Sequence, residues 1–194
     1  MLRKIANTFQ TSLAIALIGF LTVWLSVRLL GAERQGIISL FLINISVIQI
    51  FSSIAGGAGL VYLVPRYGIS RVFFPSLTWA CICSLLGSFL MRKLSILQSS
   101  FFIHTIALSF FQALILNNLQ MLIAKDKVSI YNLCRLLQPV VIFMAFGLQL
   151  LITSHHSVSL YFNSLYISFL SVLCISTYFT LKGERFAVKY FDPE

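Results

Sequence analysis

The charged residues of this 194-residue chain are few, and they divide it into long stretches that contain no charge. Those stretches are 5–27, 35–65, 72–91, 94–124 and 136–181. A helix that spans a membrane needs roughly 20 mainly apolar residues, because about 30 Å of hydrocarbon is crossed at about 1.5 Å per residue. Each stretch is long enough for one such helix, and the last is long enough for two.

This pattern predicts an all-α, polytopic integral membrane protein, in which residues 1–181 form a bundle of six transmembrane helices. A β-barrel would instead show short segments of alternating apolar and polar residues. We interpret residues 182–194 as a cytoplasmic tail or as the start of a connector to a further domain. The expected spans are Ala6–Leu30, Gly36–Val64, Phe74–Met91, Phe101–Ala124, Leu136–Ile152 and Val158–Leu181.

The basic residues predict the orientation of the bundle. With a cytoplasmic N-terminus, ten basic residues lie at the inner ends of the spans and four at the outer ends. This bias follows the positive-inside rule, so we expect both termini in the cytoplasm. The four basic residues at the outer ends of the spans are Arg28, Arg34, Arg92 and Lys93.

The basic residues are scattered singly or in pairs along the chain, which argues against a nucleic-acid partner.

Polar residues inside the spans indicate which helix faces avoid lipid, because an unpaired polar group in hydrocarbon costs several kcal/mol. Such stripes fit either hydrogen bonding between packed helices or the lining of a wet cavity. Gln49, Gln112 and Asn117 are the costliest to bury and favour a cavity. The glycine-rich segment 52–59 fits either close helix packing or a hinge beside a transport path.

Several kinds of site find no support in the sequence. All five acidic residues lie in loops or in the tail, whereas ion-coupled carriers generally place an Asp or Glu within the membrane. The histidines and cysteines lack the spacing of metal ligands. No nucleophile with its base, phosphate-binding loop or paired carboxylates is present. We therefore expect no enzyme activity, no cofactor and no metal.

Three segments resemble the polysaccharide-biosynthesis (O-antigen) flippases of the multidrug/oligosaccharidyl-lipid/polysaccharide exporter superfamily. Residues 28–36 follow the pattern Arg-x-Leu-Gly-x-Glu-x-x-Gly that ends the first helix of that family. Residues 56–59, followed by Pro-Arg-Tyr at 65–67, resemble the end of its second helix. Residues 124–132 resemble the short basic loop between its fourth and fifth helices. The family has two six-helix lobes, and this chain resembles only the first.

The resemblance implies a function in the cytoplasmic (inner) membrane. One lobe of a flippase would help to move an undecaprenyl-diphosphate-linked oligosaccharide across the bilayer by alternating access, with a second six-helix lobe or another copy of the chain as partner. Membrane lipid is the other partner implied. Cationic residues would hold the diphosphate, and polar side chains would line its path. The residues expected to bind this substrate are Arg28, Gln49, Gln112, Asn117, Arg66 and Arg135.

Two other functions remain open from the sequence. The chain fits one lobe of a toxic-compound extrusion carrier, although the missing membrane carboxylate speaks against it. It also fits a non-transporting membrane scaffold or subunit whose polar stripes bind a partner.

Overall fold

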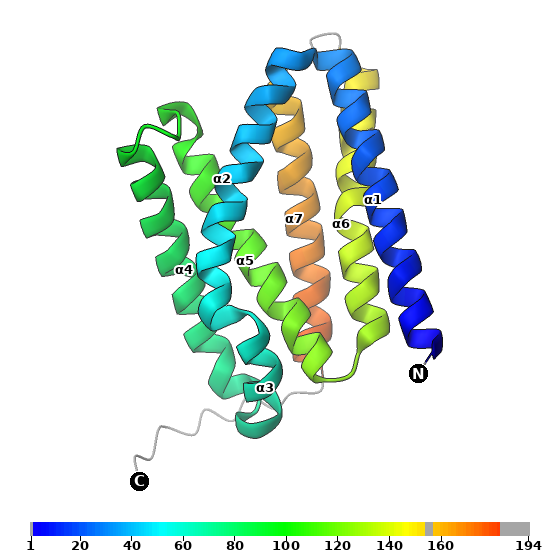
Figure 1. Ribbon diagram of the computed structural model, residues 1–194, viewed down its shortest axis with the longest axis vertical. Coiled ribbons are helices and arrows are strands. Elements are labelled where there is room, and N and C mark those ends of the chain that lie inside the picture. Colours follow the sequence, from blue (N-terminus) through cyan, green and yellow to red (C-terminus); the bar gives the residue numbers. More distant parts are fainter. Residues whose placement is uncertain (1, 154–156, 183–194) are drawn as a thin grey trace.

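The computed structural model describes residues 2–153 and 157–182 and contains a bundle of long α-helices (Figure 1). Six helical segments are long and apolar enough to cross a membrane, which confirms the predicted all-α polytopic fold. The start of the first helix and the end of the last lie at the same end of the bundle (Figure 1). The helices are α1 (Leu2–Leu30), α2 (Ala32–Gly56), α3 (Ala58–Tyr67), α4 (Ile69–Lys93), α5 (Phe102–Ala124), α6 (Val128–Ile152) and α7 (Val158–Leu181), with a short 3-10 turn, η1 (Ser99–Phe101), before α5.

Two of the helix junctions consist of a single glycine with a positive φ angle. Gly31 joins α1 to α2 at φ 87°, and Gly68 joins α3 to α4 at φ 77°. In each case the glycine N–H donates to the carbonyl four residues earlier, Val27 or Val64. Glycine adopts this backbone region without the steric cost that a Cβ brings. The Gly31 junction explains why residues 28–36 interrupt an otherwise apolar sequence.

The second candidate span runs from Ala32 to Tyr67 and is broken at Gly57, between α2 and α3. A Cβ on Gly57 would lie 2.5 Å from the Ser53 carbonyl oxygen, and one on Gly56 would lie 2.2 Å from Asn117 Oδ1 on α5. The first interpretation of this glycine-rich segment, close helix packing, applies to Gly56, whereas a hinge beside a transport path stays a prediction. Gly56 allows close helix packing, and Gly57 interrupts the helix.

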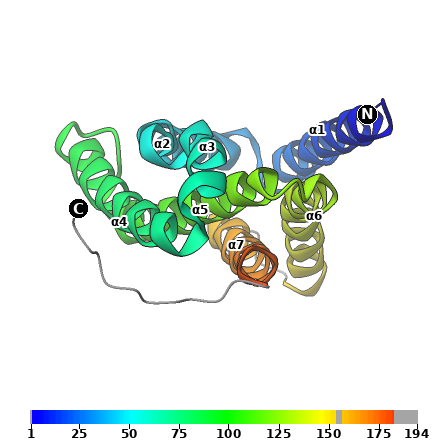
Figure 2. The ribbon, with the colours of Figure 1, turned by 90° about the horizontal axis from the view of Figure 1, so that it is seen from below.

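Helix α5 occupies the middle of the bundle and packs against α2, α3, α4, α6 and α7 (Figure 2). Its contact with α7 is a polar seam, which we call the α5–α7 seam. Asn118 Nδ2 donates to Ser176 Oγ at 3.1 Å and to Thr177 Oγ1 at 2.8 Å, and the Thr180 hydroxyl donates to the Asn118 carbonyl. Small polar residues that pair across helices are typical of packing within membranes.

The basic loop between α5 and α6 caps the C-terminal end of α7. Lys125 Nζ donates to the Thr180 carbonyl at 2.8 Å, and Lys127 Nζ donates to the Phe179 carbonyl at 3.2 Å. The last carbonyls of a helix have no intrahelical partner, and positive charge there is favoured by the helix dipole. These lysines therefore stabilise the C-terminal end of the last span.

Several of the predicted spans differ in extent from the helical segments that contain them. The span predicted at 136–152 lies in α6, which begins at Val128, and the span predicted at 74–91 lies in α4, which begins at Ile69. The span predicted at 36–64 falls within the broken Ala32–Tyr67 segment. Residues 154–156, between the last two predicted spans, lie outside the described residues, and so does the tail or connector predicted at 182–194, apart from Lys182.

Candidate functional site

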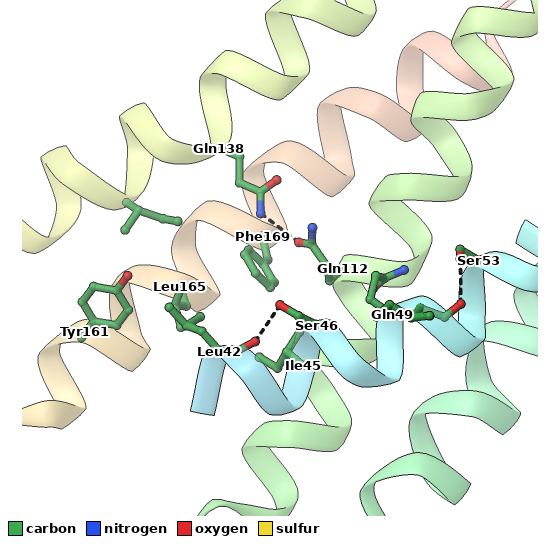
Figure 3. A pocket seen from close by; sticks show the side chains of 12 residues that line it. Leu42, Ile45, Ser46, Gln49, Ser53, Gln112, Gln138, Tyr161, Leu165 and Phe169 are labelled. Carbon is green, nitrogen blue, oxygen red and sulfur yellow. Dashed lines mark hydrogen bonds between the residues drawn. The ribbon is translucent and has the colours of Figure 1, made fainter. Parts of the chain in front are cut away.

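A cavity of about 470 Å³ lies between α2, α5, α6 and α7 (Figure 3). We call it the glutamine cavity, after the three glutamines in its wall. No charged residue occurs among the described residues that line it. The lining consists of Leu42, Ile45, Ser46, Gln49, Ile50, Ser53, Gln112, Gln138, Ile142, Tyr161, Leu165 and Phe169.

Helix α2 contributes a stripe of polar residues to the glutamine cavity. Ser46, Gln49 and Ser53 follow one another at spacings of three and four residues, which places them on one helical face. The two serine hydroxyls donate to carbonyls of their own helix, Ser46 to Leu42 at 2.9 Å and Ser53 to Ile50 at 2.7 Å (Figure 3). Gln49 Oε1, in contrast, is buried and has no hydrogen-bond partner among the described residues.

The other two glutamines bind each other across the helices. Gln138 Nε2 on α6 donates to Gln112 Oε1 on α5 at 2.8 Å (Figure 3). Each side chain uses one of its two amide atoms in this pair, so Gln112 keeps donor capacity and Gln138 keeps acceptor capacity. The peptide carbonyl of Gln138 is also used, because it accepts the Ser168 hydroxyl of α7 at 2.8 Å.

A second cavity, of about 320 Å³, lies beside the first, between α1, α5 and α6. We call it the arginine cavity. Gln112, Gln138 and Ile142 line both cavities, so the Gln112–Gln138 pair forms part of the wall between them. The lining consists of Ile15, Gln112, Leu116, Leu119, Gln120, Tyr131, Arg135, Gln138, Pro139 and Ile142.

Arg135 is the charged residue of the arginine cavity. It is the eighth residue of α6, and at about 1.5 Å per residue it lies about 10 Å from the start of that helix. Its guanidinium carbon lies 5.3 Å from the centroid of the Tyr131 ring, within cation–π range. Pro139 has no N–H to donate to the Arg135 carbonyl, which is the bond an ordinary residue would make there. The cavity therefore combines a cation with polar groups in an otherwise apolar wall.

The structure brings together three of the six residues predicted to bind substrate. Gln49 and Gln112 line the glutamine cavity, and Gln112 and Arg135 line the arginine cavity. Asn117 lines neither, because it is buried against Gly56 and donates to the Ser76 carbonyl of α4 at 3.3 Å. Its surroundings are those of a packing residue.

The other two predicted residues lie at the ends of helices. Arg28 is exposed in the last turn of α1, with its guanidinium carbon 5.2 Å from the centroid of the Trp24 ring. Arg66 is exposed in the last turn of α3, 4.0 Å from the centroid of the Tyr62 ring. Neither is among the lining residues of the two cavities. Their role in substrate binding stays a prediction from the family resemblance.

Gln138 is the cavity residue that the sequence analysis missed. The criterion that selected Gln49 and Gln112, an amide within an uncharged stretch, applies equally to Gln138 in the stretch 136–181. Its position three residues after Arg135 is a further signal, since residues three apart lie on one face of a helix. Tyr161 and Phe169 had no such signal, because aromatic residues are common throughout the chain.

Searches for similar proteins give no match: neither a family model, nor a curated protein, nor a solved structure matches this chain. The molecule is a six-helix polytopic membrane protein with two adjoining polar cavities. Its resemblance to the exporters rests on the short sequence segments alone.

Proposed function

We propose that the chain is one lobe of a flippase that moves a lipid-linked oligosaccharide across the inner membrane. The observation that carries this proposal is the position of Arg135, which lines a cavity together with glutamines well inside a membrane-spanning helix. A charged residue within a span is costly and usually marks the path of a substrate or ion. No acidic residue is among the described residues that line the two cavities, which favours an anionic substrate over a cation.

The proposed mechanism assigns the diphosphate to arginine and the lipid tail to the bilayer. A diphosphate cannot cross hydrocarbon unaided, whereas a guanidinium can hold phosphate oxygens with two parallel hydrogen bonds. With both termini in the cytoplasm, Arg135 would receive the headgroup near the cytoplasmic end. Arg28 would contact it near the opposite end, where it is released. Rocking of two lobes would move the headgroup between these positions.

A second lobe is part of this proposal. The substrate must be shielded from lipid on all sides while it crosses, and six helices provide only one wall of such a path. The partner would be another six-helix polypeptide or a second copy of this chain. A scaffold that merely binds a partner protein would use the same polar surface without binding lipid-linked sugar.

Lipid binding tests the proposal directly. We expect the purified full chain in nanodiscs to bind a polyprenyl-diphosphate-linked oligosaccharide and to lose about 10–100-fold in affinity on Arg135→Ala, since a hydrogen bond to a charged group contributes about 1.5–3 kcal/mol. The affinity of Arg135→Lys should lie between those of the wild type and Arg135→Ala, because lysine keeps the charge and lacks the planar guanidinium. The matched control is Arg92→Ala, which removes an exposed arginine stacked on Phe102. Equal binding by wild type and Arg135→Ala would contradict the proposal.

Translocation tests the need for a second lobe. We expect the monomeric chain in liposomes to bind a fluorescent lipid-linked oligosaccharide without moving it between leaflets. A fluorophore that is reduced only in the outer leaflet would measure this. Translocation by a chain shown to be monomeric would overturn the one-lobe proposal.

A further inference from the structure

The glutamine cavity has the chemistry of a site for an uncharged polyhydroxy compound. Its polar lining consists of three amides, two serine hydroxyls and the Tyr161 hydroxyl, and the rest is apolar or aromatic. Amides and hydroxyls each offer both donors and acceptors, as the hydroxyl groups of a sugar do. The rings of Tyr161 and Phe169 add flat apolar surface, and its volume of about 470 Å³ is within the range of small-molecule sites.

The glutamines have unused hydrogen-bonding capacity. Gln49 Oε1 is buried without a partner among the described residues, and the Gln112–Gln138 bond uses only one amide atom of each side chain. Because the oxygen and nitrogen of a glutamine amide exchange places by a simple flip, Gln49 can present either a donor or an acceptor to the cavity. A ligand with several hydroxyl groups would satisfy these atoms at little cost.

The same lining is unfavourable to a charged sugar. A carboxylate that leaves water for an apolar cavity requires a cationic partner, and the residues that line the glutamine cavity provide none. A cation, Arg135, lines the adjoining cavity and lies three residues before Gln138 on α6. The two cavities therefore differ in the ligand groups that they suit. The arginine cavity suits an anion, and the glutamine cavity suits neutral hydroxyl groups.

From this difference we infer that the glutamine cavity binds the first sugars of the substrate, that these sugars are uncharged, and that the diphosphate attached to them lies in the arginine cavity. The inference rests on the proposed function. The shared wall of Gln112, Gln138 and Ile142 places the two parts of such a headgroup side by side. The Gln112–Gln138 pair then contacts the substrate where sugar and phosphate are joined.

Three lipids with one diphosphate and different sugars test the inference. They are a polyprenyl diphosphate without sugar, the same lipid with a neutral disaccharide, and the same lipid with a uronic acid in place of one neutral sugar. For the full chain in nanodiscs, we expect the neutral disaccharide to improve affinity about tenfold or more, as one or two additional hydrogen bonds would. The uronic acid should give no such improvement.

Two substitutions of Gln49 give this experiment a matched comparison. Gln49→Leu should remove most of the gain from the neutral disaccharide and should lower the affinity for the neutral lipid far more than the affinity for the sugar-free lipid. Gln49→Lys places a cation in the glutamine cavity and should reverse the preference toward the uronic acid. This reversal is a gain of binding that a merely misfolded variant could not produce.

The outcomes separate the inference from the proposed function. Equal affinity for the sugar-free and neutral lipids would overturn the inference and leave the binding of diphosphate by Arg135 intact. A uronic acid bound as tightly as the neutral sugar by the wild-type chain would overturn it as well. Failure to bind any of the three lipids would overturn both.

Discussion

The α5–α7 seam and the glutamine cavity are built from the same kinds of residue, but they differ in how their polar atoms are satisfied. In the seam, Asn118 bonds Ser176 and Thr177, and Thr180 bonds back to Asn118. In the cavity, Gln49 Oε1 has no partner among the described residues, and two further amides are paired through one atom each. The Asn118 amide nitrogen makes two bonds in the seam, whereas the cavity contains a buried amide oxygen that has no partner among the described residues.

This difference distinguishes a polar residue that packs helices together from one that is available to bind a ligand. A buried amide without a partner is costly in hydrocarbon, so it persists where a ligand or another subunit supplies the missing bond. Asn117 illustrates the other case, since its side chain fills the space that Gly56 leaves open. The residue type alone does not show whether an amide packs helices or binds a ligand. Its hydrogen-bond partners in the folded protein decide between these two roles.

The largest change in stability is expected at the close contact of Gly56 with Asn117. A Cβ there would lie 2.2 Å from Asn117 Oδ1, and moving that buried amide would disturb its bond to Ser76. We expect Gly56→Ala to lower the unfolding free energy in detergent by about 1–3 kcal/mol, the usual cost of overpacking. Gly59→Ala is the matched control, because a Cβ at Gly59 meets no atom within 4 Å. Equal stability of the two variants would show that the contact is not tight.

Removing the central amide of the seam should have the next largest effect. Asn118→Leu abolishes two hydrogen bonds between α5 and α7 while keeping a side chain of similar size. Interhelical bonds in membranes contribute about 0.6 kcal/mol on average and at most about 1.7, so we expect a loss of about 1–2 kcal/mol. Denaturation followed by circular dichroism would measure it. An unchanged unfolding free energy for Asn118→Leu would mean that the hydrogen bonds of the seam contribute no more to stability than those of the cavity.

A smaller effect is expected where Lys127 caps α7. Lys127→Met removes the donor to the Phe179 carbonyl and keeps most of the apolar stem. The expected loss of stability is about 0.3–1 kcal/mol and should shrink at high salt, because the interaction includes a helix dipole. Thermal unfolding at two ionic strengths would show this. A loss that does not depend on salt would assign the effect to packing.

The smallest change in stability is expected from Gln49→Leu, although its effect on sugar binding is large. The substitution removes a buried oxygen without a partner, so the ligand-free protein should be as stable as the wild type or slightly more stable. The same melting experiment as for Asn118→Leu would make the comparison. A loss as large as that of Asn118→Leu would indicate that Gln49 is a packing residue.

Much of the fold could be predicted from the placement of charge. Charged side chains avoid hydrocarbon, so they mark helix ends, and the described helices α1, α5 and α7 end at the predicted Leu30, Ala124 and Leu181. The starts of α4 and α6 differ from the prediction because a charged side chain does not by itself end a helix. Its backbone bonds continue through Arg71 and Arg135, whose charges had been taken to mark the boundary.

The candidate site could be predicted only in part. Amide side chains within an uncharged stretch indicate a polar interior, and this reasoning found Gln49 and Gln112 and applied equally to Gln138. It could not distinguish Asn117, whose role depends on a contact with Gly56 more than fifty positions away in the chain. The pairing of helices is set by side-chain packing over the whole bundle, and a single sequence does not display it.

Because the junction at Gly31 is a single residue, a small change of its backbone angles would move the far end of α1 over a large distance. Helix α1 has 29 residues and is therefore about 43 Å long, and it packs chiefly against α6 (Figures 1 and 2). With no loop between α1 and α2, any change in the angle between them falls on the backbone dihedrals at that glycine. A rotation of about 10° at Gly31 would carry the far end of α1 through about 7 Å. Because α1 forms one wall of the arginine cavity through Ile15, about midway along the helix, a small twist of one residue would widen or narrow that cavity by roughly half this distance.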